Sequence, residues 1–353
     1  MRRGIHLSTK KPDKQAQAIT LLTETPLLEL GQEADEMRLA LHPERVVTFI
    51  VDRNINYTNV CVNKCSFCAF YKDEGDEEAY IIDEGVLMEK IRETISLGGT
   101  QILMQGGLHP ALDLSYYTSM LQKIKKEFTI NVHGFSPPEI AYMAAKAGLT
   151  VRDTLAALKD AGLDSIPGGG AEILSDRVRS AISPRKINTA AWLQVMREAH
   201  LLGMRTTATM MFGTIETPED IAAHLEAVWR LQAETGGFTA FIPWTFQPGG
   251  SPLGRTAGHA TAADYLRVLA LCRLYLDNVD NIQASWVTQG IKTAQVALRF
   301  GANDFGSTMI EENVVKAAGV AFMVTKNDII NAIRSSGFKP AQRDTFYNVL
   351  NYF

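Results

Sequence analysis

Cys61-Val-Asn-Lys-Cys65-Ser-Phe-Cys68 brings together three of the four cysteines of the chain, while Cys272 lies far away in the sequence. Thiolates hold the irons of Fe–S clusters, and each iron takes its own protein ligand. Three thiolates can therefore grip a [4Fe-4S] cube at three corners and leave its fourth iron open. An open coordination position is where a metal site binds and activates another molecule, as catalytic zinc sites do.

Two other interpretations of these cysteines are open. A structural zinc site needs a fourth Cys or His, and no further one lies between Asn54 and Leu108. A disulfide framework is typical of short secreted chains, whereas this chain has 353 residues and four cysteines. We therefore favour a cluster that is held by Cys61, Cys65 and Cys68.

The composition limits the functions that fit the chain. Hydrophobic residues make up 46% and charged residues 21%, which is typical of a globular domain with a sizeable core. The net charge of −4 favours neither nucleic acid nor an anionic membrane as a partner. No apolar run approaches the roughly 20 residues that span a bilayer, and the N-terminus lacks the apolar segment of a secretory signal. Together with thiols that must stay reduced, these features predict a cytoplasmic location.

Strand-length runs alternate with helical patterns along the chain. The β-branched run at residues 46–51 leads directly to the cysteine loop, and further strands are expected at 101–104, 129–133, 164–166, 205–212, 238–244, 282–286 and in a last unit from about 303. Alternation of this kind predicts an α/β fold with parallel strands joined by helices. Eight units favour a complete (β/α)8 TIM-type barrel, with a splayed barrel of six units as the alternative.

The domain organisation follows from the same alternation. We expect residues 1–45 to form an N-terminal helical cap, because two apolar helical stretches are separated there by Pro26. Residues 46–325 would form the barrel. Residues 326–353 would form a C-terminal tail that folds back over it.

Loops that follow the strands of such a barrel meet at one face, where active sites form. Gly106 and Gly107 let the backbone approach a ligand closely, although a tight turn alone would also need them. Glu172 ends a glycine-rich loop and is a candidate base or cofactor ligand. His109 is a candidate for acid–base work, and Arg255 for a bidentate grip on an anionic substrate. Ordinary surface roles for the last three are open alternatives.

The C-x3-C-x2-C arrangement resembles the signature of the radical S-adenosylmethionine (SAM) superfamily. The resemblance implies that the open iron binds SAM through its amino and carboxylate groups and reduces it to a 5′-deoxyadenosyl radical. It also implies that Phe67 lies near the adenine of SAM, Gly106 and Gly107 near its amino group, and Glu172 near its ribose or amino group. The superfamily usually has Gly-Gly-Glu after the second strand, and this chain has Leu108 in place of the Glu.

Longer stretches are similar to one family of that superfamily, the cyclic dehypoxanthinyl futalosine synthases of menaquinone biosynthesis. The likeness runs from about residue 15 to residue 344 and is carried by residues 52–61, 65–71, Gln101-Ile-Leu-Met-Gln-Gly-Gly-Leu-His-Pro110 and Ser165-Ile-Pro-Gly-Gly-Gly-Ala-Glu172. It implies that the adenosyl radical takes a hydrogen from the sugar of dehypoxanthine futalosine, and that the carbon radical adds to the benzoate ring. Loss of an electron and a proton would then restore aromaticity.

This resemblance also implies partners and residue roles. An external electron donor would reduce the [4Fe-4S] cluster, Arg255 would hold the benzoate, and His109 or Glu172 would take the ring proton. Related radical SAM enzymes share much of the pattern, so aminofutalosine synthase and the deazaflavin-forming synthases of coenzyme F420 are alternatives. A non-catalytic Fe–S electron carrier is the alternative from another functional class.

Overall fold

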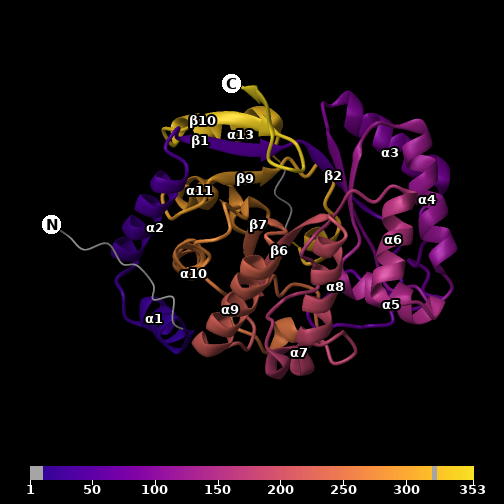
Figure 1. Cartoon of the computed structure of the whole chain (residues 1–353), viewed down its shortest axis with the longest axis horizontal. Helices are drawn as coiled ribbons and strands as arrows, with labels where there is room; N and C mark the ends of the chain where they lie inside the picture. Colours follow the sequence, from indigo (N-terminus) through magenta and orange to yellow (C-terminus); the bar gives the residue numbers. More distant parts are fainter. Residues whose placement is uncertain (1–10, 320–323) are drawn as a thin grey trace.

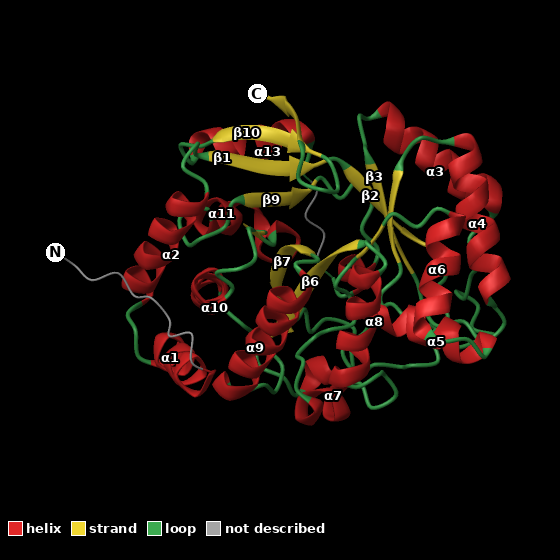
Figure 2. Cartoon of the chain, viewed as in Figure 1, coloured by secondary structure: helices red, strands yellow, loops and turns green. Residues whose placement is uncertain are grey.

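The computed structural model describes residues 11–319 and 324–353, and its parallel strands close into a barrel (Figures 1 and 2). The first strand is interrupted at Val51, which divides it into β1 and β2. The strands of the barrel are β1 (Val46–Ile50), β2 (Asp52–Asn56), β3 (Gln101–Gln105), β4 (Asn131–Gly134), β5 (Ser165–Ile166), β6 (Arg205–Phe212), β7 (Phe238–Thr245), β8 (Asn281–Ile282) and β9 (Asp304–Ser307).

Pairing between neighbouring strands closes the barrel. The strands from β2 to β8 pair in parallel in chain order, β9 pairs in parallel with β1, and a bridge between Gln283 and Asp304 joins β8 to β9. Since β1 and β2 form one strand, the circuit contains eight parallel strands, and the predicted (β/α)8 barrel is confirmed. The strand expected at residues 282–286 was too long, because Trp286 already begins a helix and its indole donates to the Ser307 carbonyl oxygen (2.8 Å).

Helices cover the outside of the barrel (Figure 2). They are α3 (Glu84–Ser96), α4 (Leu114–Glu127), α5 (Pro137–Ala147), α6 (Val151–Ala161), α7 (Asp176–Ile182), α8 (Thr189–Leu201), α9 (Pro218–Thr235), α10 (Ala262–Tyr275) and α11 (Trp286–Ala297), with a short 3-10 helix, η1 (Leu253–Arg255), and α12 (Val314–Ala317) in loops. Side-chain caps begin several of these helices. Asp83 accepts two backbone N–H groups of α3, and Ser136 and Thr217 begin capping boxes at α5 and α9. Among the described helices, none combines the length and the apolar character that crossing a bilayer requires.

Two N-terminal helices, α1 (Lys11–Thr23) and α2 (Leu27–Leu41), pack on the outside of the barrel, as expected for the N-terminal segment. Lys14 of α1 is buried, and its ammonium lies 4.1 Å from the centre of the Trp229 ring and 4.7 Å from that of Tyr275. A desolvated cation over aromatic faces is a favourable contact. It holds α1 against α9 and α10.

The C-terminal segment contains α13 (Lys326–Ser335), β10 (Lys339–Arg343) and β11 (Val349–Tyr352). The sequence analysis expected a folded-back tail but assigned no strand to it. In the structure β10 adds to the barrel sheet by pairing in parallel with β1, and β11 pairs antiparallel with β10. At the end of β10 the Arg343 guanidinium donates to both carboxylate oxygens of Asp304 (2.6 and 3.1 Å). Because Asp304 begins β9, the tail closes the end of the barrel opposite the cysteine loop.

Candidate active site

Three free thiols gather in the loop that follows β2. Burial raises the pKa of the Cys65 thiol to about 11, Lys186 opposes that rise, and Glu172, Cys68 and Cys61 add to it. All three sulfurs therefore lie within electrostatic range of one another. Burial also raises the pKa of Cys68, and two backbone amides further along the loop oppose this. Thiolates beside backbone amide donors are the ligands of Fe–S clusters. In the part of the chain that the structure describes, no three His, Cys, Asp or Glu side chains are placed so that they could hold a metal ion, so the three cysteines remain candidate ligands.

The two glycines predicted to lie near the cofactor pack directly against the cysteine loop. The Gly107 amide donates to the Thr58 carbonyl oxygen (3.0 Å). A Cβ atom on Gly107 would lie 2.0 Å from the Val60 carbonyl oxygen and 2.9 Å from Cβ of Cys61. A Cβ on Gly106 would lie 2.6 Å from the Tyr57 ring. Only glycine fits this close approach, and the backbone there forms a cradle beside the thiols.

The Glu139 carboxylate holds this cradle through hydrogen bonds. Its Oε1 accepts hydrogen bonds from the Tyr57 hydroxyl (2.7 Å) and the Gly106 amide (3.1 Å), and its Oε2 accepts from the amide and hydroxyl of Ser136 (2.7 and 2.5 Å). The sequence identified Glu139 only as part of a capping box. In the structure it also joins the end of β2 to the loop after β3.

Glu172 lies buried beside the thiols in left-handed backbone conformation (φ 42°). Its Oε1 lies 2.9 Å from Lys186 Nζ, and its Oε2 lies 3.8 Å from Arg179 and accepts no hydrogen bond from the described residues. The Lys186 ammonium is 5.0 Å from the centre of the Phe67 ring. Burial lowers the pKa of Lys186, but the negative charges of Cys65 and Glu172 outweigh it, so that the net shift is upward. A carboxylate, a cation and an aromatic face thus meet next to the candidate cluster ligands.

The other two predicted site residues lie elsewhere. His109 is buried, and its Nδ1 accepts a hydrogen bond from the Ala111 amide (3.0 Å). Burial lowers the pKa of its imidazole. Arg255 is exposed at the end of η1. The structure brings neither side chain to the wall of the barrel cavity.

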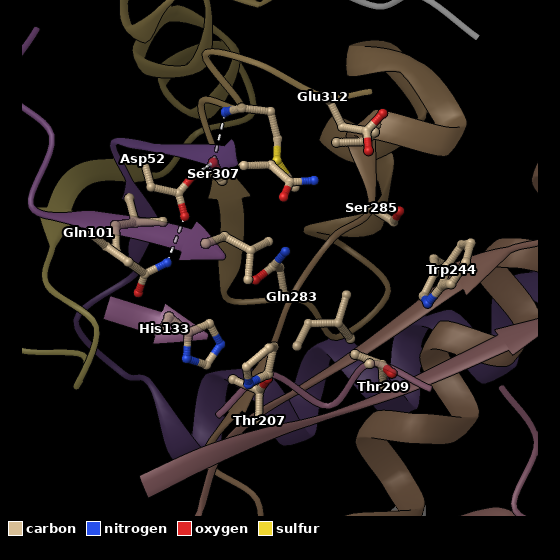
Figure 3. A pocket seen from close by; sticks show the side chains of 18 of the residues that line it. Asp52, Gln101, His133, Thr207, Thr209, Trp244, Gln283, Ser285, Ser307 and Glu312 are labelled. Atoms are coloured by element: carbon tan, nitrogen blue, oxygen red, sulfur yellow. Dashed lines mark hydrogen bonds between the residues drawn. The ribbon is translucent and has the colours of Figure 1, made fainter. Parts of the chain in front are cut away.

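A cavity of about 270 Å³ occupies the inside of the barrel, with lining residues on or directly after each of the strands β1 to β9. Figure 3 shows part of its wall. Its wall has an apolar part, which includes Ile242 and Trp244, and a polar part, which includes Asp52, Gln101 and His133. Figure 3 shows Asp52 between its two hydrogen-bond partners. A largely apolar cavity with a few convergent polar groups is the usual form of a small-molecule site.

The sequence suggested that Arg53, Asn54 and Asn56 could position SAM or a carboxylate, but it gave no role to Asp52 or Lys186, which the structure places at the site. Asp52 and Asn54 line the cavity because β2 continues through a polar stretch, whereas the intervening Arg53 points outward and donates to Glu93 of α3 (2.7 Å). The alternation of polar residues after Val51 was a signal that the strand continues. Lys186 carried no comparable signal.

A closed α/β barrel whose first strand leads into three convergent thiols, flanked by a glycine cradle, defines a radical SAM enzyme. Residues 55–228 match the family model described as "Radical SAM superfamily", and residues 235–352 match "CofH/MqnC C-terminal region". The chain belongs to the radical SAM superfamily and, within it, to the family that contains the cyclic dehypoxanthine futalosine synthases. A [4Fe-4S] cluster and SAM are the cofactors that this membership implies.

Similar proteins carry two different names. A cyclic dehypoxanthine futalosine synthase from Halalkalibacterium halodurans is 46% identical, over 95% of this chain and 91% of the relative. One of the same name from Streptomyces coelicolor is 43% identical, over 95% and 84%. A 5-amino-6-(D-ribitylamino)uracil–L-tyrosine 4-hydroxyphenyl transferase from Methanopyrus kandleri is 42% identical, over 91% and 88%.

Solved structures share the fold at low sequence identity. Methylornithine synthase PylB superposes with a TM-score of 0.73 at 19% identity and covers 96% of this chain and 95% of its own. The FeFe-hydrogenase maturase HydG from Carboxydothermus hydrogenoformans superposes with a TM-score of 0.77 at 17% identity, over 98% and 78%. These likenesses agree with the barrel described above.

Proposed function

We propose that this enzyme cyclises dehypoxanthine futalosine to cyclic dehypoxanthine futalosine in the futalosine route to menaquinone. The observation that carries the proposal is the 46% identity, over nearly the whole chain, to a relative named for this reaction. The joint placement of thiols, glycine cradle and barrel cavity supports it. When bound, the cluster and SAM supply the 5′-deoxyadenosyl radical.

The residues of the chain would position the reactants. Cys61, Cys65 and Cys68 would hold the cluster, and the carbonyl groups of Gly106 and Gly107 would bind the SAM amino group. Glu172 Oε2, which accepts no hydrogen bond from the described residues, would bind the ribose or the amino group of SAM. The barrel wall encloses the substrate and excludes water, which protects a carbon radical from quenching.

Partners and location follow from this chemistry. The reaction needs an external one-electron donor, and the substrate is a small molecule rather than nucleic acid or membrane. The cytoplasmic location expected from the cysteine content remains a prediction. Arg255 as the benzoate partner and His109 as a base also remain predictions, since neither lines the cavity.

A second candidate function is the transfer of a 4-hydroxyphenyl group from tyrosine to a ribitylaminouracil, because a relative named as such a transferase is 42% identical over 91% of the chain. The test uses anaerobically reconstituted protein with SAM, dithionite and each substrate set in turn, with products identified by mass spectrometry. We expect one 5′-deoxyadenosine for each cyclic dehypoxanthine futalosine formed. A ribitylaminouracil that carries the hydroxyphenyl group of tyrosine would overturn the proposal in favour of the transferase. Covalent adenosyl capture would indicate an aminofutalosine-type addition, and absence of SAM cleavage an electron carrier.

A further inference from the structure

Asp52 is a buried carboxylate in the barrel wall whose direct partners are uncharged. Its Oδ2 accepts a hydrogen bond from Gln101 Nε2 (2.6 Å), and its Oδ1 accepts one from the Ser307 hydroxyl. The side chain is only 2% exposed. Burial raises its pKa to about 6, although both hydrogen bonds and Arg343 act in the opposite direction and Asp304 adds a small rise. Near neutral pH such a group is ionised and still basic enough to take a proton.

The other ionisable side chains that line the cavity, among the described residues, are Arg343, Glu312, His133 and Tyr347. Arg343 donates to both carboxylate oxygens of Asp304. Glu312 accepts hydrogen bonds from three backbone amides at the start of α12 (2.7 to 3.1 Å). His133 shares a hydrogen bond with Ser165 Oγ (2.7 Å), and burial lowers its pKa to about 3, which makes it a weak base. Burial also raises the pKa of the Glu312 carboxyl and that of the Tyr347 phenol, so the phenol keeps its own proton. Asp52 differs from Glu312 in that its direct partners are two neutral side chains rather than the amides of a helix start.

We infer that Asp52 accepts the proton that leaves the aromatic ring of the substrate, an inference that rests on the proposed cyclisation. Addition of the sugar carbon radical forms the new C–C bond and leaves the attacked ring carbon with its hydrogen and an unpaired electron in the ring. The C–H bond then breaks, and its proton goes to a carboxylate oxygen of Asp52. One electron of that bond pairs with the ring electron to restore aromaticity. The other leaves to a one-electron acceptor of the iron–sulfur class.

Placement in the barrel agrees with this role. Asp52 pairs in register with Gln101, the first residue of β3, so it lies toward the end of the barrel away from the thiols. A substrate whose sugar faces the adenosyl radical, at the thiol end, would extend its aromatic ring along the cavity toward Asp52. The neighbouring apolar wall, which includes Ile242 and Trp244, suits that ring.

The test compares single-turnover products of the wild-type holoenzyme and of Asp52→Asn, with SAM, dithionite and dehypoxanthine futalosine. Asparagine keeps the size and hydrogen-bonding capacity of the side chain but cannot take the proton. We expect 5′-deoxyadenosine to form within a few-fold of the wild-type amount. The cyclised product should fall by about 10²- to 10⁴-fold, the usual contribution of general acid–base catalysis. Retained SAM cleavage reports that the variant is folded and carries its cluster.

Two further variants separate chemistry from structure. Asp52→Glu keeps a carboxylate and should cyclise faster than Asp52→Asn. Asp52→Ala should regain product when formate is added, and the same concentration of chloride should not restore it. If Asp52→Asn cyclises with a wild-type ratio of product to 5′-deoxyadenosine, or if neither the Glu variant nor formate restores product, the inference is wrong. A wild-type enzyme that cleaves SAM without cyclising this substrate would instead refute the proposed function.

Discussion

Glu139 and Tyr57 meet through a 2.7 Å hydrogen bond that joins the start of α5 to the end of β2, and the same carboxylate oxygen holds the Gly106 amide. The superfamily pattern has a Glu directly after the two glycines, where this chain has Leu108. Here a carboxylate from another element supports the loop from inside the protein. The position of the glycine cradle therefore depends on a residue that is distant in the sequence.

The first prediction concerns Glu139→Leu, which leaves the Tyr57 hydroxyl and the Gly106 amide buried without an acceptor. Each buried polar group that loses its partner costs about 1–3 kcal/mol, so the variant should be destabilised and its cradle displaced. We expect weaker SAM binding, measured by titrating the SAM-induced change in the electron paramagnetic resonance spectrum of the reduced cluster. Tyr57→Phe removes one of the two donors to Oε1 and leaves the Gly106 amide its acceptor, so it should give a smaller effect. Wild-type SAM affinity in a destabilised Glu139→Leu protein would show that the contact serves stability alone.

The second prediction concerns the cysteines. Cys65→Ala removes one of three proposed cluster ligands. The protein should then lose the visible absorbance of the cluster, its bound iron and SAM cleavage, because two thiolates do not hold a [4Fe-4S] cluster. Cys272→Ala is the matched control, since Cys272 is a fully buried thiol within α10. It should cost on the order of 1 kcal/mol of packing and leave iron content unchanged. Equal iron loss in both variants would contradict the assignment.

Much of the fold could be predicted because its signals are local. Strands favour β-branched and apolar residues, and β6, which was predicted with its observed bounds, Arg205–Phe212, combines three threonines with an apolar end. The three thiols were predictable for the same reason, since their spacing lies within one loop. The first strand was expected to end at Val51, yet it continues to Asn56, because Asp52 and Asn54 face a cavity rather than a packed core.

The rest of the site depends on contacts between distant elements, which one sequence does not display. Lys186 lies in the loop between α7 and α8 and reaches Glu172 only because the glycine-rich loop folds back toward it. His109 also follows a strand, which predicts a place at the mouth of the barrel. Its side chain instead accepts a hydrogen bond from the Ala111 amide. Position after a strand places a residue at the correct end of the barrel, and side-chain direction decides whether it reaches the cavity.

The third prediction concerns Lys186→Met. Lys186 and Glu172 are both nearly buried, and losing the cation leaves the carboxylate with only Arg179 at 3.8 Å. Breaking a buried ion pair by removing one partner typically costs about 3–5 kcal/mol. The anaerobic melting temperature should fall, and the midpoint potential of the cluster should shift downward because a positive charge beside Cys65 is lost. Adding Glu172→Gln should restore part of the stability; a double variant no more stable than the single one would contradict the pairing.

The fourth prediction concerns how stability depends on pH at Asp52. Its pKa is raised by burial from 3.8 to about 6 in the folded protein, so the folded state favours the protonated form. This contribution to stability is fully present below the unfolded pKa and is lost as the pH rises through about 6, with a total of about 3 kcal/mol. Asp52→Asn does not titrate. The difference in the free energy of unfolding, variant minus wild type, should therefore rise by roughly 1.5 kcal/mol between about pH 5 and about pH 8. Urea denaturation of both proteins across this pH range measures the difference, and the contributions of the other titrating groups cancel in it. A difference that stays constant with pH, or that rises toward acid pH, would show that the pKa of Asp52 is not raised in the folded protein.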